Sequence, residues 1–202
     1  MQEAYKIGNA QSIGSCQMQS SYFSSCCNGR GCLSVLADGT ADHINGRRCA
    51  ILAVEASMRQ YWHMPENMEV PAFFDSVAAK VLRDMREIIF LGRTPYLSLS
   101  LLWVRERELH YYSVGSNQIF LYNGMDYQLM KRGFDTVAFE KGMTAGLVSC
   151  GVWEALNEKE MVSYLMKKEH PYDKAQHMIA GVREKNKKTA KTAAVVLVEG
   201  CL

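Results

Sequence analysis

The sequence lacks a long apolar run, a long run of one charge and a recognisable leader. No stretch of its 202 residues approaches the roughly 20 consecutive apolar residues that a membrane-spanning helix needs. Its start, MQEAYKIGNAQSIGS, lacks the apolar core of a signal peptide. The 23 basic and 21 acidic residues leave a net charge of +2, and the short basic stretch 185–191 is typical of a solvated helix end. We therefore expect a cytoplasmic protein that binds neither a membrane surface nor nucleic acid.

Paired clusters of metal-binding cysteine and histidine are also missing. Seven cysteines, an odd count without a secretion signal, predict reduced thiols. Cys26, Cys27 and Cys32 lie close together, but no second Cys or His pair at a suitable spacing completes a zinc site. The sequence thus argues against a zinc centre.

What is present fits one domain over residues 1–202, because the chain is 48 % hydrophobic and long enough to bury a core. Runs rich in Val, Leu, Ile, Tyr and Phe predict strands at 33–37, 96–104, 109–114, 118–122, 145–149 and 193–198. The turn-like segment VGSNQ predicts a hairpin between 109–114 and 118–122, and therefore some antiparallel pairing.

Helical periodicity falls in four places, two before and two after the central strands. It predicts helices at 45–61 and 72–90, one after Asn157, and one from Asp173 to near 186. Asn157 with Glu160, and Asp173 with Gln176, have the spacing of a capping box. Clustered antiparallel strands with grouped helices favour an α+β layered fold over a doubly wound parallel sheet.

The order of motifs resembles the PPM-type (type 2C) metal-dependent serine/threonine protein phosphatases. LSVLADGTADHINGRRCAILAVEA resembles the family's strand, D-G-x-G-G-H and long helix, and LHYYSVGSNQIFLYNG resembles its V-G-D-S-R-x-Y-L hairpin. AGLVSCGVWEALNEKEM resembles L-L-C-S-D-G-L-W-E, KTAAVVLVEG resembles D-N-x-T-V-V-V-V, and SIGSCQMQSSYF is a weaker match to G-x-x-R-x-x-N-x-D. These motifs span residues 13 to 200 in the family's order. The resemblance implies a four-layer α-β-β-α sandwich of two antiparallel sheets with a helix pair on each outer face.

The resemblance also implies a chemistry that this chain is poorly equipped to perform. The family uses two Mg²⁺ or Mn²⁺ ions held mainly by carboxylates, which activate a water and clamp the phosphoryl oxygens, and an arginine that grips the phosphate. Asp38 is retained, and Gly39 can still offer its backbone carbonyl. The other family positions fall on Ser21 or Tyr22 for the N-terminal Asp, Gln17 for the arginine, Cys150 for the Asp of S-D-G, and Lys191 for the Asp of D-N.

Charge decides against a dinuclear centre at these positions. The single negative charge of Asp38 is cancelled by Lys191, and the remaining hydroxyl and thiol are neutral. Even at an effective dielectric of about 20, a positive charge about 4 Å from a divalent ion costs several kcal/mol. We therefore expect no bound cofactor. The weak single-metal candidates are Asp38 and Asp42.

A second departure lies beside the expected site. The interval of about 129–142 is short here, whereas the corresponding segment in the family carries a longer flap. In addition, the family's G-D-S-R motif is replaced by Gly115-Ser116-Asn117-Gln118. We expect part of the substrate cleft to be missing.

Several residues admit two interpretations. Asp38 is a relict metal ligand or a structural turn residue, and His43 is a family motif residue or a packing residue. Lys191 is either solvated or paired with Asp38 in place of a metal. We interpret Cys150 as a buried thiol, because no arginine follows it to complete an anion-binding loop.

The sequence therefore predicts a pseudophosphatase, a catalytically inactive binding or regulatory module. Its partner would be a protein: a phosphoprotein, a kinase or an assembly component. The alternative is a diverged active metal-dependent serine/threonine phosphatase with a single Mn²⁺ or Mg²⁺ site. A third possibility is a purely structural subunit.

Overall fold

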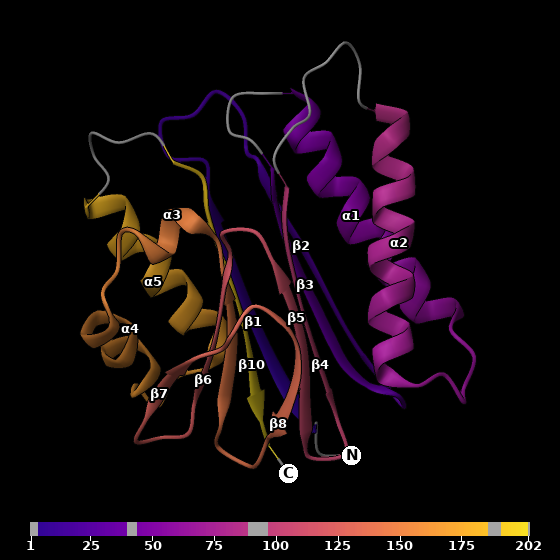
Figure 1. Cartoon of the computed structure of the whole chain (residues 1–202). Coiled ribbons are helices and arrows are strands. Elements are labelled where there is room, and N and C mark those ends of the chain that lie inside the picture. The colour runs from indigo at the N-terminus through magenta and orange to yellow at the C-terminus, as the bar shows by residue number, and fades with distance from the viewer. Residues whose placement is uncertain (1–3, 40–43, 89–96, 186–190, 202) are drawn as a thin grey trace.

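Two five-stranded antiparallel sheets pack face to face in the computed structural model, with helices on the outer face of each (Figure 1). The structure describes residues 4–39, 44–88, 97–185 and 191–201. The first sheet has the strand order β1-β10-β9-β6-β7, and the second has the order β2-β3-β4-β5-β8. The predicted α+β sandwich with four layers is confirmed.

The chain passes between the two sheets several times, and β2 to β5 are consecutive strands of the second sheet. The first sheet contains β1 (Tyr5–Ser12), β10 (Ala193–Gly200), β9 (Thr144–Val148), β6 (Gln118–Tyr122) and β7 (Tyr127–Leu129). The second contains β2 (Ser21–Asn28), β3 (Gly31–Gly39), β4 (Leu97–Arg105), β5 (Glu108–Val114) and β8 (Gly133–Ala138).

Helices close the sandwich on both sides. The second sheet is covered by α1 (Ile44–His63) and α2 (Val70–Ile88); the first is covered by α3 (Cys150–Trp153), α4 (Glu158–Leu165) and α5 (Pro171–Lys185). Among the described residues, no helix has the length and apolarity to cross a membrane.

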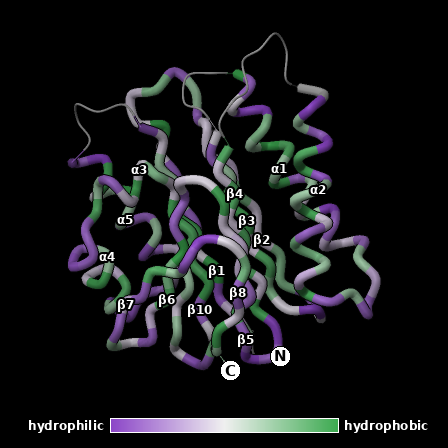
Figure 2. Tube along the Cα trace, in the orientation of Figure 1, coloured by the Kyte–Doolittle hydropathy of each residue, from purple (hydrophilic) through white to green (hydrophobic). Residues whose placement is uncertain are grey.

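The apolar pattern of β3 explains why it lies inside. Leu33 and Val35 pack toward α1 and α2, whereas Leu36 packs into the layer between the sheets. A strand that is apolar on both faces must be covered on both, because each buried large side chain contributes about 1.5–3 kcal/mol. Figure 2 shows the resulting hydrophobic stretches along β3 and β4.

The six predicted strands are confirmed apart from their ends. Residue 96, at the start of one predicted strand, lies outside the described residues, as do residues 89–90 of the predicted helix 72–90. The predicted hairpin between 109–114 and 118–122 is wrong. β5 pairs with β4 and β8, whereas β6 pairs with β7 and β9 in the other sheet. Gly115, at φ +90°, makes the turn that crosses between sheets. Both strands carry apolar residues on both faces, which a two-stranded ribbon could not bury.

The helix after Asn157 begins with the predicted capping box: Asn157 accepts from the Glu160 amide, and Glu160 accepts from the Asn157 amide. The helix predicted from about Asp173 is confirmed, but α5 begins at Pro171, where proline is well suited to the first helical turn. Asp173 therefore lies inside the first turn and is not the capping residue before the helix. The predicted end of this helix near 186 lies outside the described residues.

The prediction that all the cysteines are reduced is also wrong. Cys27 and Cys32 are directly opposite each other in the β2–β3 hairpin and form a disulfide. The spacing in CCNGRGC reflects this two-strand register, which the sequence analysis did not recognise.

The expected short flap corresponds to the end of β7 and to β8, which is the edge strand of the second sheet. No helix lies between Leu129 and Gly142, both within the described part.

Candidate functional site

Asp38 lies near the end of β3, facing the space between the sheets. Its neighbours across the second sheet are Ser21 on β2 and Ser98 on β4. Gly39 brings the first turns of α1 against this end of the strand: a Cβ at Gly39 would lie 2.1 Å from the backbone oxygen of Gly46. Only a residue without a side chain permits this approach, so two glycines fix the Asp38 end of β3 against α1.

Hydroxyl groups surround the Asp38 carboxylate. Ser20 Oγ donates to its Oδ1 at 3.0 Å, and Ser21 Oγ donates to the same oxygen at 2.9 Å. Thr192, just before β10, lies 2.6 Å from Ser20 Oγ and 3.3 Å from Ser21 Oγ, so the cluster also links the two sheets. These are neutral donors. They solvate a carboxylate but cannot replace the negative ligands of a metal pair.

Burial raises the pKa of Asp38, and the hydrogen bonds from Ser21 and Ser20 act against that rise. No basic group of the described residues lies within ion-pairing distance of this carboxylate. The dominant influence on Asp38 is therefore desolvation, which destabilises its charged form.

Asp38→Asn should therefore stabilise the protein at pH 7, because the amide oxygen can accept both serine hydrogen bonds without a charge. A folded-state pKa above the unfolded value of about 4 means that stability is lost as pH rises through this interval. We expect a melting temperature about 3 °C above wild type at pH 7 and little difference at pH 3. Thermal melts at both pH values test this; a clear loss of stability at pH 7 would show that the carboxylate is needed for the fold.

A second group lies at the start of α3. Cys150 Sγ donates to Glu154 Oε1 at 2.9 Å, and Lys191 Nζ forms an ion pair with the other Glu154 oxygen. Burial, followed by the hydrogen bond and the charge of Glu154, raises the pKa of Cys150 to about 11. The thiol is therefore protonated at neutral pH, which supports its interpretation as a thiol without a nucleophilic role.

Of the two interpretations of Lys191, the pairing with Asp38 is wrong: the ammonium is partly exposed and pairs with Glu154. The hydrogen bond that Lys191 donates to Glu154 raises the pKa of Lys191. The hydrogen bonds that Glu154 accepts from Cys150 and Lys191 lower the pKa of Glu154. Glu154 lies one helical turn after Cys150 and is half exposed, so the ammonium reaches a carboxylate that remains hydrated. Pairing there costs less desolvation than pairing with buried Asp38.

Glu154→Gln should make Cys150 more reactive, because the group that most directly disfavours its thiolate is removed and Lys191 remains. We expect alkylation of Cys150 at pH 8.5 to become roughly tenfold faster. Mass spectrometry after iodoacetamide treatment resolves Cys150 from the other cysteines, and Glu158→Gln serves as a matched control outside the cluster. Equal labelling rates in all three proteins would refute this account of the thiol.

The remaining predicted site residues are placed as follows. Ser21, rather than Tyr22, faces Asp38; Tyr22 is exposed on the opposite face of the strand. Gln17 is exposed in the loop before β2. Asp42 and His43 lie outside the described residues.

Sequence analysis missed Ser20, Thr192 and Glu154. The only available signal for Glu154 was its spacing of four residues from Cys150 on a helix, which favours contact. Ser20 and Thr192 meet because β2 and β10 start at the same end of the sandwich, a relation that no local pattern encodes.

The altered G-D-S-R segment adds hydroxyls rather than charge. Ser116 Oγ lies 3.0 Å from Ser98 Oγ, and Ser98 Oγ also accepts from the Ser116 amide at 2.8 Å. Asn117 is buried and donates to the Leu36 carbonyl at 3.3 Å. The groups beside Asp38 are thus neutral hydroxyls and an amide, and the buried Asn117 Oδ1 has no hydrogen-bond partner among the described residues.

The donor set does not fit a dinuclear metal centre. It offers one desolvated carboxylate, three hydroxyls, a protonated thiol and an ammonium-paired glutamate. Within residues 4–39, 44–88, 97–185 and 191–201, no group of three or more His, Cys, Asp or Glu could hold a metal ion. Hard divalent cations require several anionic oxygens, so this geometry does not support two-metal chemistry.

No family model matches the sequence, and no curated relative matches it. Solved structures do match. The serine/threonine phosphatase of S. agalactiae has 16 % identity and a TM-score of 0.83, covering 97 % of this chain and 99 % of its own. The Mycobacterium tuberculosis phosphatase PstP/Ppp has 12 % identity and a TM-score of 0.80, covering 98 % of this chain and 99 % of its own.

A structure of the PstP catalytic domain contains two manganese ions. It is 13 % identical to this chain, with a TM-score of 0.81, and the match covers 98 % of this chain and 99 % of the PstP chain. PppA, a key regulatory component of T6SS in Pseudomonas aeruginosa, has 14 % identity, a TM-score of 0.81 and coverage of 98 % of each chain. The likeness extends over nearly the whole of both chains in each case. The protein therefore has the fold of the PPM-type serine/threonine phosphatases.

Proposed function

We propose that this protein is a pseudophosphatase, a type 2C phosphatase-like domain that binds a protein partner in the cytoplasm and does not hydrolyse phosphoesters. The observation that carries the proposal is the environment of Asp38. Its partners are neutral hydroxyls, and the two nearby positions that resemble the family's other aspartates hold a protonated thiol and an ammonium.

Glu154 adds a negative charge to the site that the sequence motifs did not indicate. With Asp38 and Glu154 negative and Lys191 positive, the site has a net charge of −1, against the four carboxylates that the family resemblance implies. Two divalent ions would bring four positive charges to this site. Coulomb repulsion from Lys191 and the shortage of anionic ligands both oppose their binding.

An assay with a small aryl phosphate and Mn²⁺ tests the proposal. Purified protein should release product at the rate of the buffer blank, and Asp38→Asn should give the same rate. Hydrolysis above the blank that disappears in Asp38→Asn would overturn the assignment, because contaminating phosphatase would not respond to this substitution.

The binding role is tested separately by capture of partners with tagged protein, followed by mass spectrometry. Treating the lysate with a broad phosphatase beforehand distinguishes the partner classes: loss of capture identifies a phosphoprotein, and retained capture favours a kinase or an assembly component recognised independently of phosphate. If no protein is enriched over a tag-only control, the binding role fails.

One observation favours the alternative of an active single-metal enzyme: the Asp38 carboxylate is desolvated and has no cationic partner among the described residues. Calorimetric titration with Mn²⁺ decides this point. Heat from binding below 1 mM that is absent in Asp38→Asn would support the single-metal site, and its absence supports the pseudophosphatase.

A further inference from the structure

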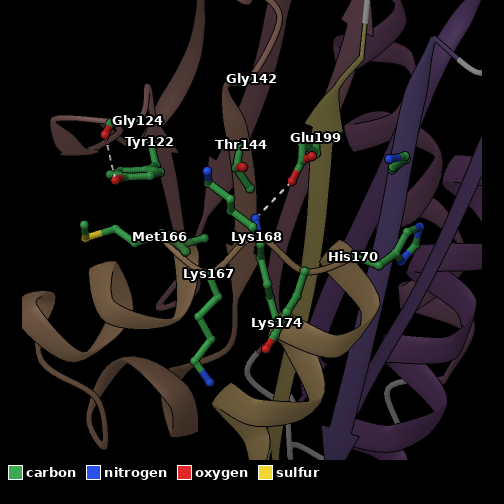
Figure 3. Close-up of a pocket in the computed structure, with 13 residues that line it drawn as sticks. Tyr122, Gly124, Gly142, Thr144, Met166, Lys167, Lys168, His170, Lys174 and Glu199 are labelled. Atoms are coloured by element: carbon green, nitrogen blue, oxygen red, sulfur yellow. Dashed lines mark hydrogen bonds and ion pairs between the residues drawn. The ribbon is translucent and has the colours of Figure 1, made fainter.

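We infer that a pocket at the opposite end of the first sheet binds a small phosphate-bearing anion. The pocket, called here the α4–α5 pocket, has a volume of about 560 Å³ and is lined by Lys6, Thr144, Lys168, His170, Lys174 and Glu199, among others (Figure 3). That volume is in the range of sites for small molecules, about 300–1,000 Å³.

Strand register separates this pocket from Asp38. Lys6, Glu199, Thr144 and Tyr122 are consecutive cross-strand neighbours on β1, β10, β9 and β6. Glu199 lies seven residues along the chain from Thr192, close to the full length of β10. The α4–α5 connection also lines the pocket, which lies at the other end of β10 from Thr192 and shares no residue with the Asp38 site.

The floor of the pocket contains a buried ion pair. Lys174 is 5 % exposed, and its Nζ lies 3.0 Å from Glu199 Oε2. Figure 3 shows Lys174 reaching from α5 toward Glu199 beside Thr144. The ammonium of Lys174 has three N–H donors, and its hydrogen-bonding partner is Glu199. Lys174 can therefore still donate to a ligand, although Glu199 balances its charge.

Two lysines on the sides of the pocket, Lys6 and Lys168, have no acidic partner among the described residues. Both are exposed, and neither forms an ion pair or side-chain hydrogen bond with the described residues. Glu169, another lining residue, has its Oε2 3.0 Å from His177 Nδ1 and keeps its negative charge at the pocket. The four lining lysines, Lys6, Lys167, Lys168 and Lys174, against Glu169 and Glu199 leave the pocket a net charge of +2, which favours an anion.

His170 lies at the margin of the pocket, and its ring points away from the ammonium of Lys174 (Figure 3). Its Nδ1 accepts from the Tyr172 amide at 3.2 Å, so in the neutral ring the proton is on Nε2. The first amides of α5 are already used, because Tyr172 N–H donates to His170 Nδ1 and the N–H groups of Asp173 and Lys174 donate to the His170 carbonyl. The lysines therefore carry the inference, because ammonium groups bind phosphate and the pocket has room for a compact anion with several charges.

Titration calorimetry with inorganic pyrophosphate, without divalent metals and at low salt, tests this inference. We expect saturable binding, weakened about fivefold or more by Lys6→Ala and by Lys168→Ala. Lys167→Ala is the matched control: Lys167 also lines the pocket, but its side chain points away from Lys174 and Glu199 and its ammonium lies over the Tyr164 ring. It should change the affinity less than twofold, although it removes the same charge from the adjacent position.

Two further titrations locate the binding site and identify which part of the ligand is recognised. Lys191→Ala should leave pyrophosphate binding unchanged; if that variant abolishes binding, the anion occupies the Asp38 end and the inference is wrong. ADP in place of pyrophosphate identifies the source: tighter binding means that an organic group contributes, and equal binding means that the phosphates suffice. No binding at millimolar pyrophosphate, or equal losses in Lys167→Ala and Lys168→Ala, would also overturn it.

Discussion

Cys150→Asp combined with Lys191→Asp should create Mn²⁺ binding in a protein that otherwise has none measurable at 1 mM. The two substitutions change the charge of the Asp38, Cys150, Glu154 and Lys191 group from −1 to −4. A unit charge about 4 Å from a divalent ion interacts by several kcal/mol even at an effective dielectric of about 20. We therefore expect the affinity for Mn²⁺ to increase by at least about 100-fold, since every 1.4 kcal/mol is tenfold.

Calorimetric titration of the double variant measures this directly. Lys185→Asp is a suitable control, because it also replaces a lysine that is paired with a glutamate, Glu160, but on α5 and away from Asp38. Circular dichroism establishes that each variant is folded. If the folded double variant binds Mn²⁺ no better than the control, missing charge is not the reason for the absent metal centre.

Gly39→Ala should be the most destabilising small substitution near the site. The added Cβ would lie 2.1 Å from the Gly46 oxygen and 2.4 Å from its carbonyl carbon, both backbone atoms that move only with α1. Overpacking of this kind costs about 1–3 kcal/mol, and we expect the upper end. For a chain of this size that corresponds to a melting temperature about 9 °C lower.

Gly29→Ala provides the matched control, because a Cβ there meets nothing within 4 Å. It should shift the melting temperature by less than about 2 °C, as surface substitutions usually do. Similar shifts for the two variants would mean that the close approach of α1 to β3 does not constrain the Asp38 end of the sheet.

The fold was largely predictable because its central strands are apolar on both faces. β3, β4 and β10 carry continuous apolar runs, and the capping box at Asn157 marks a helix start locally. Four described strands were missed, β1, β2, β7 and β8, and these are the edge strands of the two sheets. YKIGNAQS and SYFSSCCN, for example, contain many small and polar residues that edge strands tolerate.

The site was less predictable because its contacts depend on tertiary geometry. Asp38 and Ser21 could be identified from motif order, but the partner of Lys191 could not. Glu154 competes for Lys191 from a solvated position, and that preference depends on the relative burial of two carboxylates. The hairpin error has the same origin: residues 109–114 and 118–122 lie next to each other in sequence, yet each pairs with strands of a different sheet.

The central claim is tested most directly by a crystal grown in excess Mn²⁺, with diffraction recorded at the manganese absorption edge. The account predicts no anomalous peak within coordination distance of the Asp38 carboxylate, whose oxygen stays bound to Ser20 and Ser21. Two manganese peaks between the sheets, bridged by Asp38, would contradict it and identify the protein as a metal-dependent phosphatase.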